Sequence, residues 1–167
     1  MSYMWSAVSF CYYMIIFQLK YIPGNIYINS ISSSLSEMVA NILAGFLYKY
    51  LKGKLSFIIC FCIALVGGSL ILFLGVDDVK WVPVFITLAK GGIAANFTIV
   101  YIASAEVYPT LFTATALGIC NFFARFLTIL APYVAELDPP IPMAVFCSLC
   151  IGGIVLAFFI VEQKKID

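Results

Sequence analysis

Long apolar runs separated by short polar connectors dominate this chain. A helix needs about 20 apolar residues to cross the hydrocarbon core of a bilayer, whereas a barrel strand needs about ten residues in an alternating pattern. Only helices and closed barrels satisfy their backbone hydrogen bonds in lipid. The pattern therefore predicts an all-α membrane protein, a single domain over 1–167 with six transmembrane helices at approximately 4–19, 26–48, 55–76, 82–104, 111–134 and 142–161.

The composition agrees with a membrane protein and argues against several other classes. Hydrophobic residues make up 64% of the chain and charged residues 10%, with no histidine, whereas a soluble domain has about 25% charged residues. No basic stripe interleaves with aromatic residues, so we expect no nucleic acid partner. The six cysteines lie inside apolar runs, where we expect them to pack as small hydrophobic residues rather than bind metal. With no nucleophile–base pair and no metal cluster, we expect neither an enzyme nor a cofactor.

The lysines orient the predicted helices. Lys49, Lys52 and Lys54 follow the second apolar run, and Lys164 and Lys165 lie near the C-terminus. The connectors predicted on the opposite side hold fewer lysines and more acidic residues. Because lysine and arginine accumulate on the cytoplasmic side of membrane proteins, we predict that both termini lie in the cytosol.

Three ionisable residues fall deep inside the predicted helices, namely Glu37, Lys90 and Arg125. Each costs on the order of 3 kcal/mol at the centre of a bilayer, so each should face a protein interior or a wet cavity. One interpretation is an interhelical ion pair of Glu37 with Lys90 or Arg125. One acid against two bases leaves at least one cation unmatched, and an anionic ligand could neutralise it.

Small residues crowd the fourth and fifth predicted helices. They occur at Gly91–Ala95 and at Ala114 with Gly118, four residues further on. In membranes such residues let helix backbones approach closely. We expect tight packing at both places, with no ligand required.

A motif between the fourth and fifth helices identifies a family. Ala105–Thr110 reads AEVYPT and is followed by Gly118, Ala124-Arg125 and Ala131-Pro132. This series resembles the signature of the organic cation and anion transporters of the major facilitator superfamily. The resemblance extends along nearly the whole chain through shorter matches at Tyr12-Tyr13, Gly24–Asn29, Lys52–Lys54 and Lys90–Phe97.

The resemblance implies a fold and a way of working. Transporters of this family have twelve helices in two six-helix halves, with the substrate bound between the halves near the middle of the membrane. The chain matches the C-terminal half only, and Met1 begins where helix seven is expected. We therefore expect that the chain does not transport alone and that its partner is a second six-helix half or another membrane protein subunit.

The resemblance also implies a substrate site. Family members that carry anions and zwitterions have arginine at the position of Arg125, whereas many cation transporters have aspartate there. Some anion transporters also carry a lysine where this chain has Asn41, so the match to them is incomplete. The expected substrate-binding residues are Arg125, Lys90, Glu37, Tyr12, Tyr13 and Phe97.

A second set of residues is expected to form a cytoplasmic gating motif. By the resemblance, Glu106, Pro109 and Thr110 form the turn between helices ten and eleven, and Gly53-Lys54 belong to a basic loop. Proline ends one helix and threonine can cap the next, while the glutamate supplies a carboxylate for a gating contact. The family has an arginine at the position of Thr113, so one gate partner is missing here.

Two functions are consistent with these patterns. The first is transport of small organic ions, with anions or zwitterions preferred, by alternating access in a multi-pass protein of the plasma membrane or of an organelle membrane. The second is a structural subunit of a larger membrane complex that derives from such a transporter and no longer transports.

Overall fold

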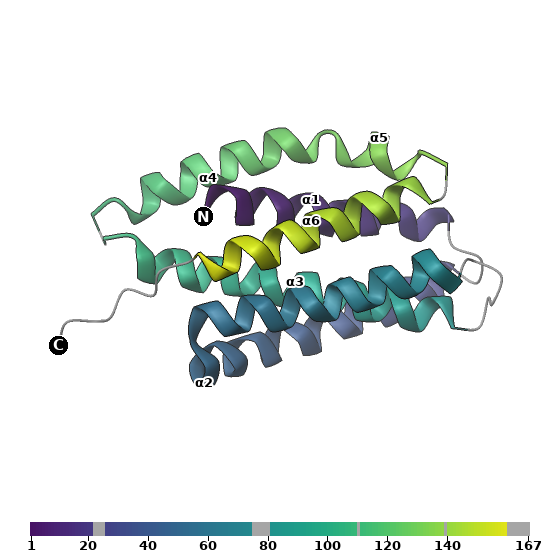
Figure 1. Cartoon of the computed structure of the whole chain (residues 1–167), viewed down its shortest axis with the longest axis horizontal. Helices are drawn as coiled ribbons and strands as arrows, with labels where there is room; N and C mark the ends of the chain where they lie inside the picture. The colour runs from purple at the N-terminus through teal and green to yellow at the C-terminus, as the bar shows by residue number, and fades with distance from the viewer. Residues whose placement is uncertain (22–25, 75–80, 110, 139, 160–167) are drawn as a thin grey trace.

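The computed structural model describes residues 1–21, 26–74, 81–109, 111–138 and 140–159. Within these ranges the chain is helical and contains no strand, so the predicted all-α class is confirmed. Figure 1 shows the helices running lengthwise, with α4 and α5 along one edge, α2 along the other, and α1, α6 and α3 between them. The elements in chain order are α1 (Ser2–Gln18), the short 3-10 helix η1 (Leu19–Tyr21), α2 (Ile26–Leu74), α3 (Val82–Val107), α4 (Thr113–Thr128), α5 (Ala131–Ala135) and α6 (Ile141–Phe158).

Helix α2 turns back on itself at Lys52. This residue has a φ of 59° and a ψ of 179°, which break the helical backbone, and the change of direction is visible in Figure 1. The hydroxyl of Ser56 donates hydrogen bonds to the carbonyl oxygens of Lys52, at 2.6 Å, and of Leu47, at 3.2 Å. These bonds satisfy carbonyls that a helix end leaves open. The turn lies in the polar connector between the second and third predicted helices.

Four helices of the described residues are long and apolar enough to cross a membrane. They are Ser30–Phe73, which is the bent α2 taken as one, Pro83–Val107, Thr113–Ala135 and Ile141–Phe158. Helix α1 has 17 residues and is shorter than these. The predicted helix at 111–134 corresponds to α4 followed by α5, with a turn at Ile129 and Leu130 just before Pro132. Such lengths and compositions are those of an integral membrane protein.

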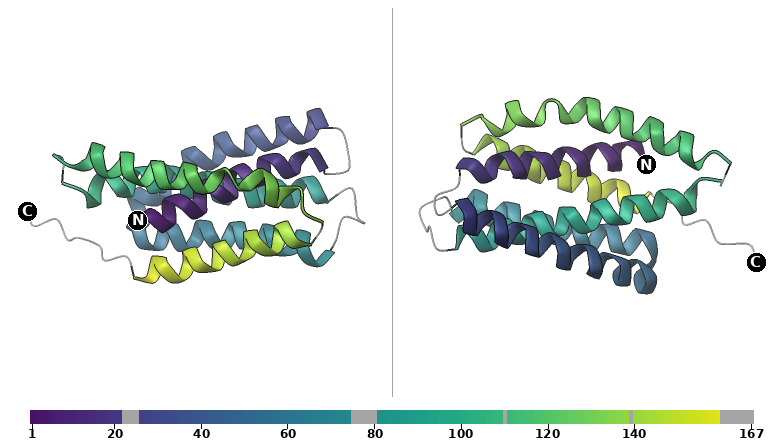
Figure 2. Two further views of the ribbon diagram at one scale, coloured as in Figure 1. Left: turned by 90° about the horizontal axis from the view of Figure 1, so that it is seen from above. Right: turned by 180° about the vertical axis from the view of Figure 1, so that it is seen from behind.

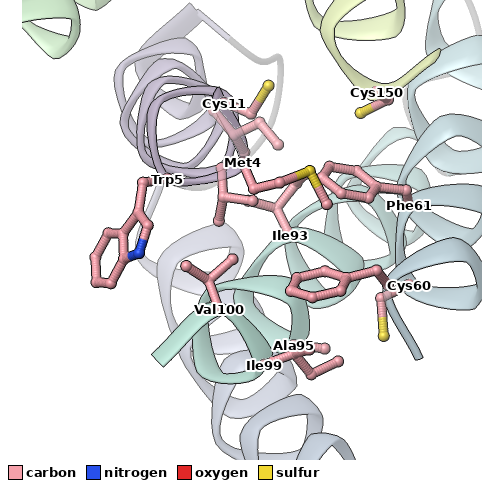
Figure 3. Close-up of a cluster of buried hydrophobic side chains, with 14 of the residues drawn as sticks. Met4, Trp5, Cys11, Cys60, Phe61, Ile93, Ala95, Ile99, Val100 and Cys150 are labelled. Atoms are coloured by element: carbon pink, nitrogen blue, oxygen red, sulfur yellow. The ribbon is translucent and has the colours of Figure 1, made fainter. Parts of the chain in front are cut away.

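A single buried core joins α1, α2, α3 and α6 and also includes Cys120 and Ala124 of α4 and Ala131 and Ala135 of α5. Figure 3 shows it as a continuous cluster in which side chains of α1 and α2 meet the central helix α3. Because each lipid tail is as apolar as leucine, dispersion contacts within such a core, rather than exclusion of water, hold membrane helices together. Its members include Met4, Trp5, Cys11, Phe61, Ile93, Ile99, Val100 and Cys150.

The small residues of α3 permit the closest helix contacts. A Cβ atom added at Gly92 would lie 2.7 Å from the backbone nitrogen of Ala64 in α2. The reverse contact occurs at Gly67, where an added Cβ would lie 2.6 Å from the backbone nitrogen of Ala89. The expected close approach at Gly91–Ala95 is thus confirmed. It is wrong for Gly118, which has nothing within 4 Å of an added Cβ, because α4 packs mainly against α1 and turns this face outward.

Candidate functional site

A cavity of about 240 Å³ is bounded by residues of α1, α2, α3 and α4. Helices α1 and α4 lie side by side in both views of Figure 2. Their residues form one part of the cavity wall, and residues of α2 and α3 form the rest. Five of the six residues proposed from the sequence as substrate-binding line it, while Lys90 does not. The complete lining is Tyr12, Tyr13, Glu37, Asn41, Ala94, Phe97, Thr98, Tyr101 and Arg125.

Glu37 uses both carboxylate oxygens within the protein. Its Oε2 lies 3.3 Å from the Nζ of Lys90, and its Oε1 accepts a 2.6 Å hydrogen bond from the hydroxyl of Tyr12. The side chain of Lys90 is only 8% exposed, against 27% for Glu37. The Nζ of Lys90 also lies 5.8 Å from the ring centroid of Tyr12, within the range of a cation–π contact. Of the two pairings considered from the sequence, the structure has Glu37 with Lys90.

Arg125 has a different environment. It projects from the last turn of α4, is exposed, and donates a hydrogen bond to the hydroxyl of Tyr13. Its guanidinium carbon lies 5.3 Å from the ring centroid of Tyr13. Among the described residues Arg125 makes no ion pair. A guanidinium has five N–H donors, so most of them remain available on the side of the cavity.

An aromatic cluster forms the apolar part of the wall. The rings of Tyr12 and Phe97 are 5.6 Å apart, and those of Phe97 and Tyr101 are 5.5 Å apart. Trp5 packs edge-on against Tyr101 at 4.5 Å and donates from its Nε1 to the Ser104 hydroxyl at 3.0 Å. These contacts fix the ring positions, because each ring is held by a neighbour from another helix or by a hydrogen bond.

The sequence prediction missed four lining residues as members of the site. Ala94, Thr98 and Tyr101 share one face of α3 with Phe97, since residues three, four and seven apart lie on the same side of a helix. That spacing is a signal from which they could have been found. Asn41, the fourth, lies opposite Thr98 on α2 and accepts a 2.9 Å hydrogen bond from the Thr98 hydroxyl.

The proposed gating glutamate has a partner that the sequence did not indicate. Glu106 is exposed near the end of α3, and its Oε2 accepts a 2.6 Å hydrogen bond from the hydroxyl of Tyr48 in α2. Within the described part of the chain Glu106 makes no ion pair. Tyr48 also packs its ring near Gly53, where an added Cβ would lie 3.5 Å away. Lys54 points elsewhere, with its Nζ 5.6 Å from the ring centroid of Phe158.

The turn after α3 is built around Pro109. Its predecessor, Tyr108, is extended, with a φ of −92° and a ψ of 136°, as expected before a proline. The carbonyl of Pro109 accepts bonds from the Phe112 amide at 2.9 Å and from the Thr113 hydroxyl at 2.8 Å. Partial burial raises the pKa of the Tyr108 phenol, with a further contribution from its contact with the Cys120 thiol. It therefore stays protonated near neutral pH.

The expected cap of the following helix is different. Thr110 itself lies outside the described residues, but the N-cap position of α4 is occupied by Phe112, without a side-chain cap. The helix begins at Thr113, and the backbone amides of Phe112 and Thr113 both donate to the carbonyl oxygen of Pro109. Nor does the described part of the chain gather three or more histidine, cysteine, aspartate or glutamate side chains into a group able to hold a metal ion.

Comparison with known proteins agrees with the motif. No family model matches the chain. It is 29% identical over 166 residues to the organic cation/carnitine transporter 2 of Homo sapiens, 27% over 167 residues to the organic anion transporter 3 of Rattus norvegicus, and 31% over 162 residues to solute carrier family 22 member 4 of Mus musculus.

These matches cover most of this chain and a minor part of each relative. They include 96%, 97% and 93% of the chain, but only 29%, 31% and 29% of the respective relatives. The chain therefore spans about 30% of the length of the curated relatives it matches. The family predicted from Ala105–Thr110 and Arg125 is confirmed: the chain is homologous to the organic cation and anion transporters of the major facilitator superfamily.

Proposed function

We propose that the chain forms one wall of a pathway that carries small organic ions across a membrane, with anions or zwitterions preferred. The observation that supports this most is the charge distribution in the cavity. Its one carboxylate, Glu37, is neutralised by Lys90, whereas Arg125 has a tyrosine for its partner. A carboxylate of an organic ion would pair with the guanidinium of Arg125 and accept two parallel hydrogen bonds from it, as arginine–carboxylate pairs commonly do.

The aromatic rings give the proposed substrate its amphipathic character. Tyr12, Phe97 and Tyr101 present apolar faces beside the polar groups Arg125 and Asn41. Binding sites for small molecules combine mostly apolar walls with a few placed polar groups. A small organic acid or zwitterion with an apolar or aromatic part fits this arrangement. Lys90 would contribute charge without touching the substrate.

We further propose six membrane crossings in one domain over 1–167. Helix α1, the two arms of α2 on either side of Lys52, α3, α4 with α5, and α6 would each cross once. Both termini then lie in the cytosol, and the connector at Lys52 lies on the same side. Single cysteines introduced at Lys52 and Asp78 should react with an impermeant thiol reagent from opposite sides. Labelling of both from one side would contradict this topology.

Transport by this chain would require a second protein surface. Alternating access is the rocking of one repeat or bundle against another around a shared site. Arg125 and the phenylalanines of α4 are exposed, so a second six-helix half or another subunit would cover them. Native mass spectrometry in mild detergent should find the chain associated. A stable lone monomer with substrate uptake would contradict this part of the proposal.

The gating motif takes part in the same proposal. Glu106 near the end of α3 would contact the other half in one access state, with Pro109 and Thr110 shaping the turn beside it. Gly53 and Lys54 would supply the neighbouring basic loop. The hydrogen bond from the Tyr48 hydroxyl would orient the Glu106 carboxylate for this contact.

Exchange of the charge at Arg125 tests the substrate preference. In a transport-competent assembly that contains this chain, Arg125→Asp should lower uptake of an organic anion and raise uptake of an organic cation of matched size. Arg125→Lys should keep the anion preference with weaker binding, because an ammonium cannot make the two parallel bonds. Equal uptake of the two ions by all three proteins would contradict the proposed role of Arg125.

A second candidate function is a structural subunit of a membrane complex that no longer transports. The observation that favours it is the gating region, where Thr113 stands in place of the family's arginine. Within the described residues, its hydroxyl donates to the carbonyl oxygens of Tyr108 and Pro109 in the same turn. Uptake into vesicles, measured on material purified without removing companions, distinguishes the two functions. Stoichiometric copurification with other proteins, together with no uptake, would favour the subunit. The plasma membrane is the proposed location, with an organelle membrane as the alternative.

A further inference from the structure

We infer that Lys90 is a positioning residue that sets the charge preference of the cavity by neutralising Glu37, and that it does not bind the substrate. This inference rests on the proposed function, because it concerns which ions the same cavity accepts. It changes the role expected for Lys90 from the sequence, where it was grouped with Arg125 as a charge partner of the substrate.

Lys90 lies behind the cavity wall. Residues Ala94, Phe97, Thr98 and Tyr101 of α3 line the cavity, whereas Lys90, one turn before Ala94, does not. The whole residue is 6% exposed. Its ammonium group contacts the Glu37 carboxylate and faces the ring of Tyr12. A substrate in the cavity would therefore meet Glu37 and Tyr12 before it could reach Lys90.

Glu37, by contrast, is part of the wall and is occupied on both oxygens. The Lys90 ammonium lies 3.3 Å from one, and the Tyr12 hydroxyl donates to the other at 2.6 Å. A carboxylate beside aromatic rings is a good site for an organic cation, since both the charge and the ring faces attract it. The ion pair with Lys90 removes that attraction. Without it, Glu37 and Arg125 would present opposite charges in the same cavity.

The formal charges make the consequence specific. Glu37, Lys90 and Arg125 together carry a net charge of +1, and the pair of Glu37 with Lys90 leaves Arg125 as the dominant charge in the cavity. Replacing Lys90 by a neutral residue makes the net charge zero and exposes the Glu37 carboxylate to the ligand. Replacing Glu37 as well restores a net charge of +1 without the ion pair. A positioning role therefore predicts loss of preference in the single variant and recovery in the double variant.

The experiment compares four proteins in lipid nanodiscs, with any copurifying companion retained. They are the unmodified chain, Lys90→Met, Lys90→Arg and the double variant Lys90→Met/Glu37→Gln. Two probes of matched shape, 3-phenylpropionate and phenethyltrimethylammonium, are used as radiolabelled ligands, and the ratio of their affinities is measured. Size-exclusion profiles and melting temperatures show whether each variant is folded.

Lys90→Met should move the affinity ratio toward the cation by roughly tenfold, the order expected for one close charge pair. Lys90→Arg and the double variant should keep the ratio of the unmodified chain. If Lys90→Met does not fold, Lys90→Arg and the double variant still test the inference, because a direct ligand role predicts loss of anion binding in the double variant. An anion-selective double variant supports the inference, and loss of anion binding there overturns it.

The two proposals fail in different ways. If the unmodified chain binds neither probe, the proposed function is contradicted and this inference is overturned with it. If the unmodified chain prefers the anion and folded Lys90→Met keeps the same ratio, only the role of Lys90 is overturned.

Discussion

Helices α3 and α4 have similar sequence features and different environments. Both are long apolar helices that contain small residues and one basic residue, Lys90 in α3 and Arg125 in α4. Of the most apolar stretch of Pro83–Val107 in α3, 56% is buried, against 17% for Thr113–Ala135, which covers α4 and α5. The difference arises because α3 packs against α1 and both arms of α2, whereas α4 packs mainly against α1. The two basic residues follow their helices, one buried and paired, the other exposed.

The comparison shows what apolar sequence means in a membrane. Phe122, Phe123 and Phe126 of α4 are more than half exposed, at 69%, 54% and 66%. Such a face would be costly in water, but lipid tails are as apolar as the side chains and impose no such cost. Helix α4 can therefore face lipid or a second protein with the same residues. Helix α3 is held in place by close contacts that only its small residues permit.

The largest expected difference between the two helices concerns their glycines. Leucine at Gly92 would drive its side chain into the backbone nitrogen of Ala64, 2.7 Å from an added Cβ, and the carbonyl of Cys60, 2.8 Å away. Because backbone on a packed helix cannot move aside cheaply, Gly92→Leu should destabilise the fold by about 3 kcal/mol or more. Monodispersity and melting temperature in detergent measure the effect.

Gly118 supplies the matched control on α4. It has open space around it, so Gly118→Leu should leave the melting temperature nearly unchanged in the isolated chain. Equal losses for the two variants would mean that α4 is packed as tightly as α3, which would break the comparison. A loss for Gly118→Leu confined to an assembled complex would sharpen it, by showing that a partner covers this face.

A matched pair of isoleucines gives the next largest effect. Ile93 of α3 is completely buried, while Ile119 of α4 is 53% exposed. Ile93→Ala should cost about 2–3 kcal/mol, because it leaves a cavity among fixed neighbours. In Ile119→Ala, lipid fills the space that the side chain leaves, so the cost should be only a few tenths of the cost for Ile93→Ala. Thermal unfolding of the two variants side by side measures the ratio, and a ratio near one would contradict the assigned burial.

The sequence specified the residue types of the site better than their arrangement. Tyr12, Tyr13, Glu37, Phe97 and Arg125 were proposed as one site and line one cavity. Glu37 and Arg125 were indicated because charges deep in a membrane must face protein or water, whereas Tyr12, Tyr13 and Phe97 were indicated by the resemblance to the family. Burial of a charge and the position of a motif are properties that a single sequence carries.

The remaining features depend on helix rotation, which a single sequence does not fix. Small residues at Gly92 and Gly118 look alike along the chain, yet only Gly92 meets a neighbouring backbone. Lys90 and Phe97 are seven residues apart and share a helix face, but packing against Glu37 puts Lys90 behind the wall. The bond between Tyr48 and Glu106 joins residues of two helices whose register is set only by the fold.

A smaller difference in stability is expected between substitutions of two tryptophans, Trp5 in α1 and Trp81 at the start of α3. Trp5 is buried, donates to Ser104 of α3 and touches Tyr101, whereas Trp81 at the start of α3 is 60% exposed. Trp5→Phe should cost about 1.5 kcal/mol, from the lost hydrogen bond and the smaller ring. Trp81→Phe should have almost no effect. A melting temperature lowered equally by both would show that the tie between α1 and α3 is weaker than the geometry indicates.

The smallest expected effect concerns the end of α3 near its turn. The Tyr48 hydroxyl donates to Glu106 at 2.6 Å, while the Thr113 hydroxyl at the start of α4 donates to carbonyl oxygens of the preceding turn. Tyr48→Phe removes one exposed hydrogen bond and should cost about 0.5 kcal/mol, with Tyr50→Phe, 77% exposed, as the control. A cysteine in place of Glu106 would itself remove the bond, so the reporter cysteine is placed at the neighbouring Ala105. It should react faster with a thiol reagent in Tyr48→Phe than in Tyr50→Phe, because the end of α3 is then less firmly held. Equal rates in both backgrounds would mean that the Tyr48 bond does not hold this end of α3. The difference in packing between α3 and α4 would then not extend to the turn that joins them.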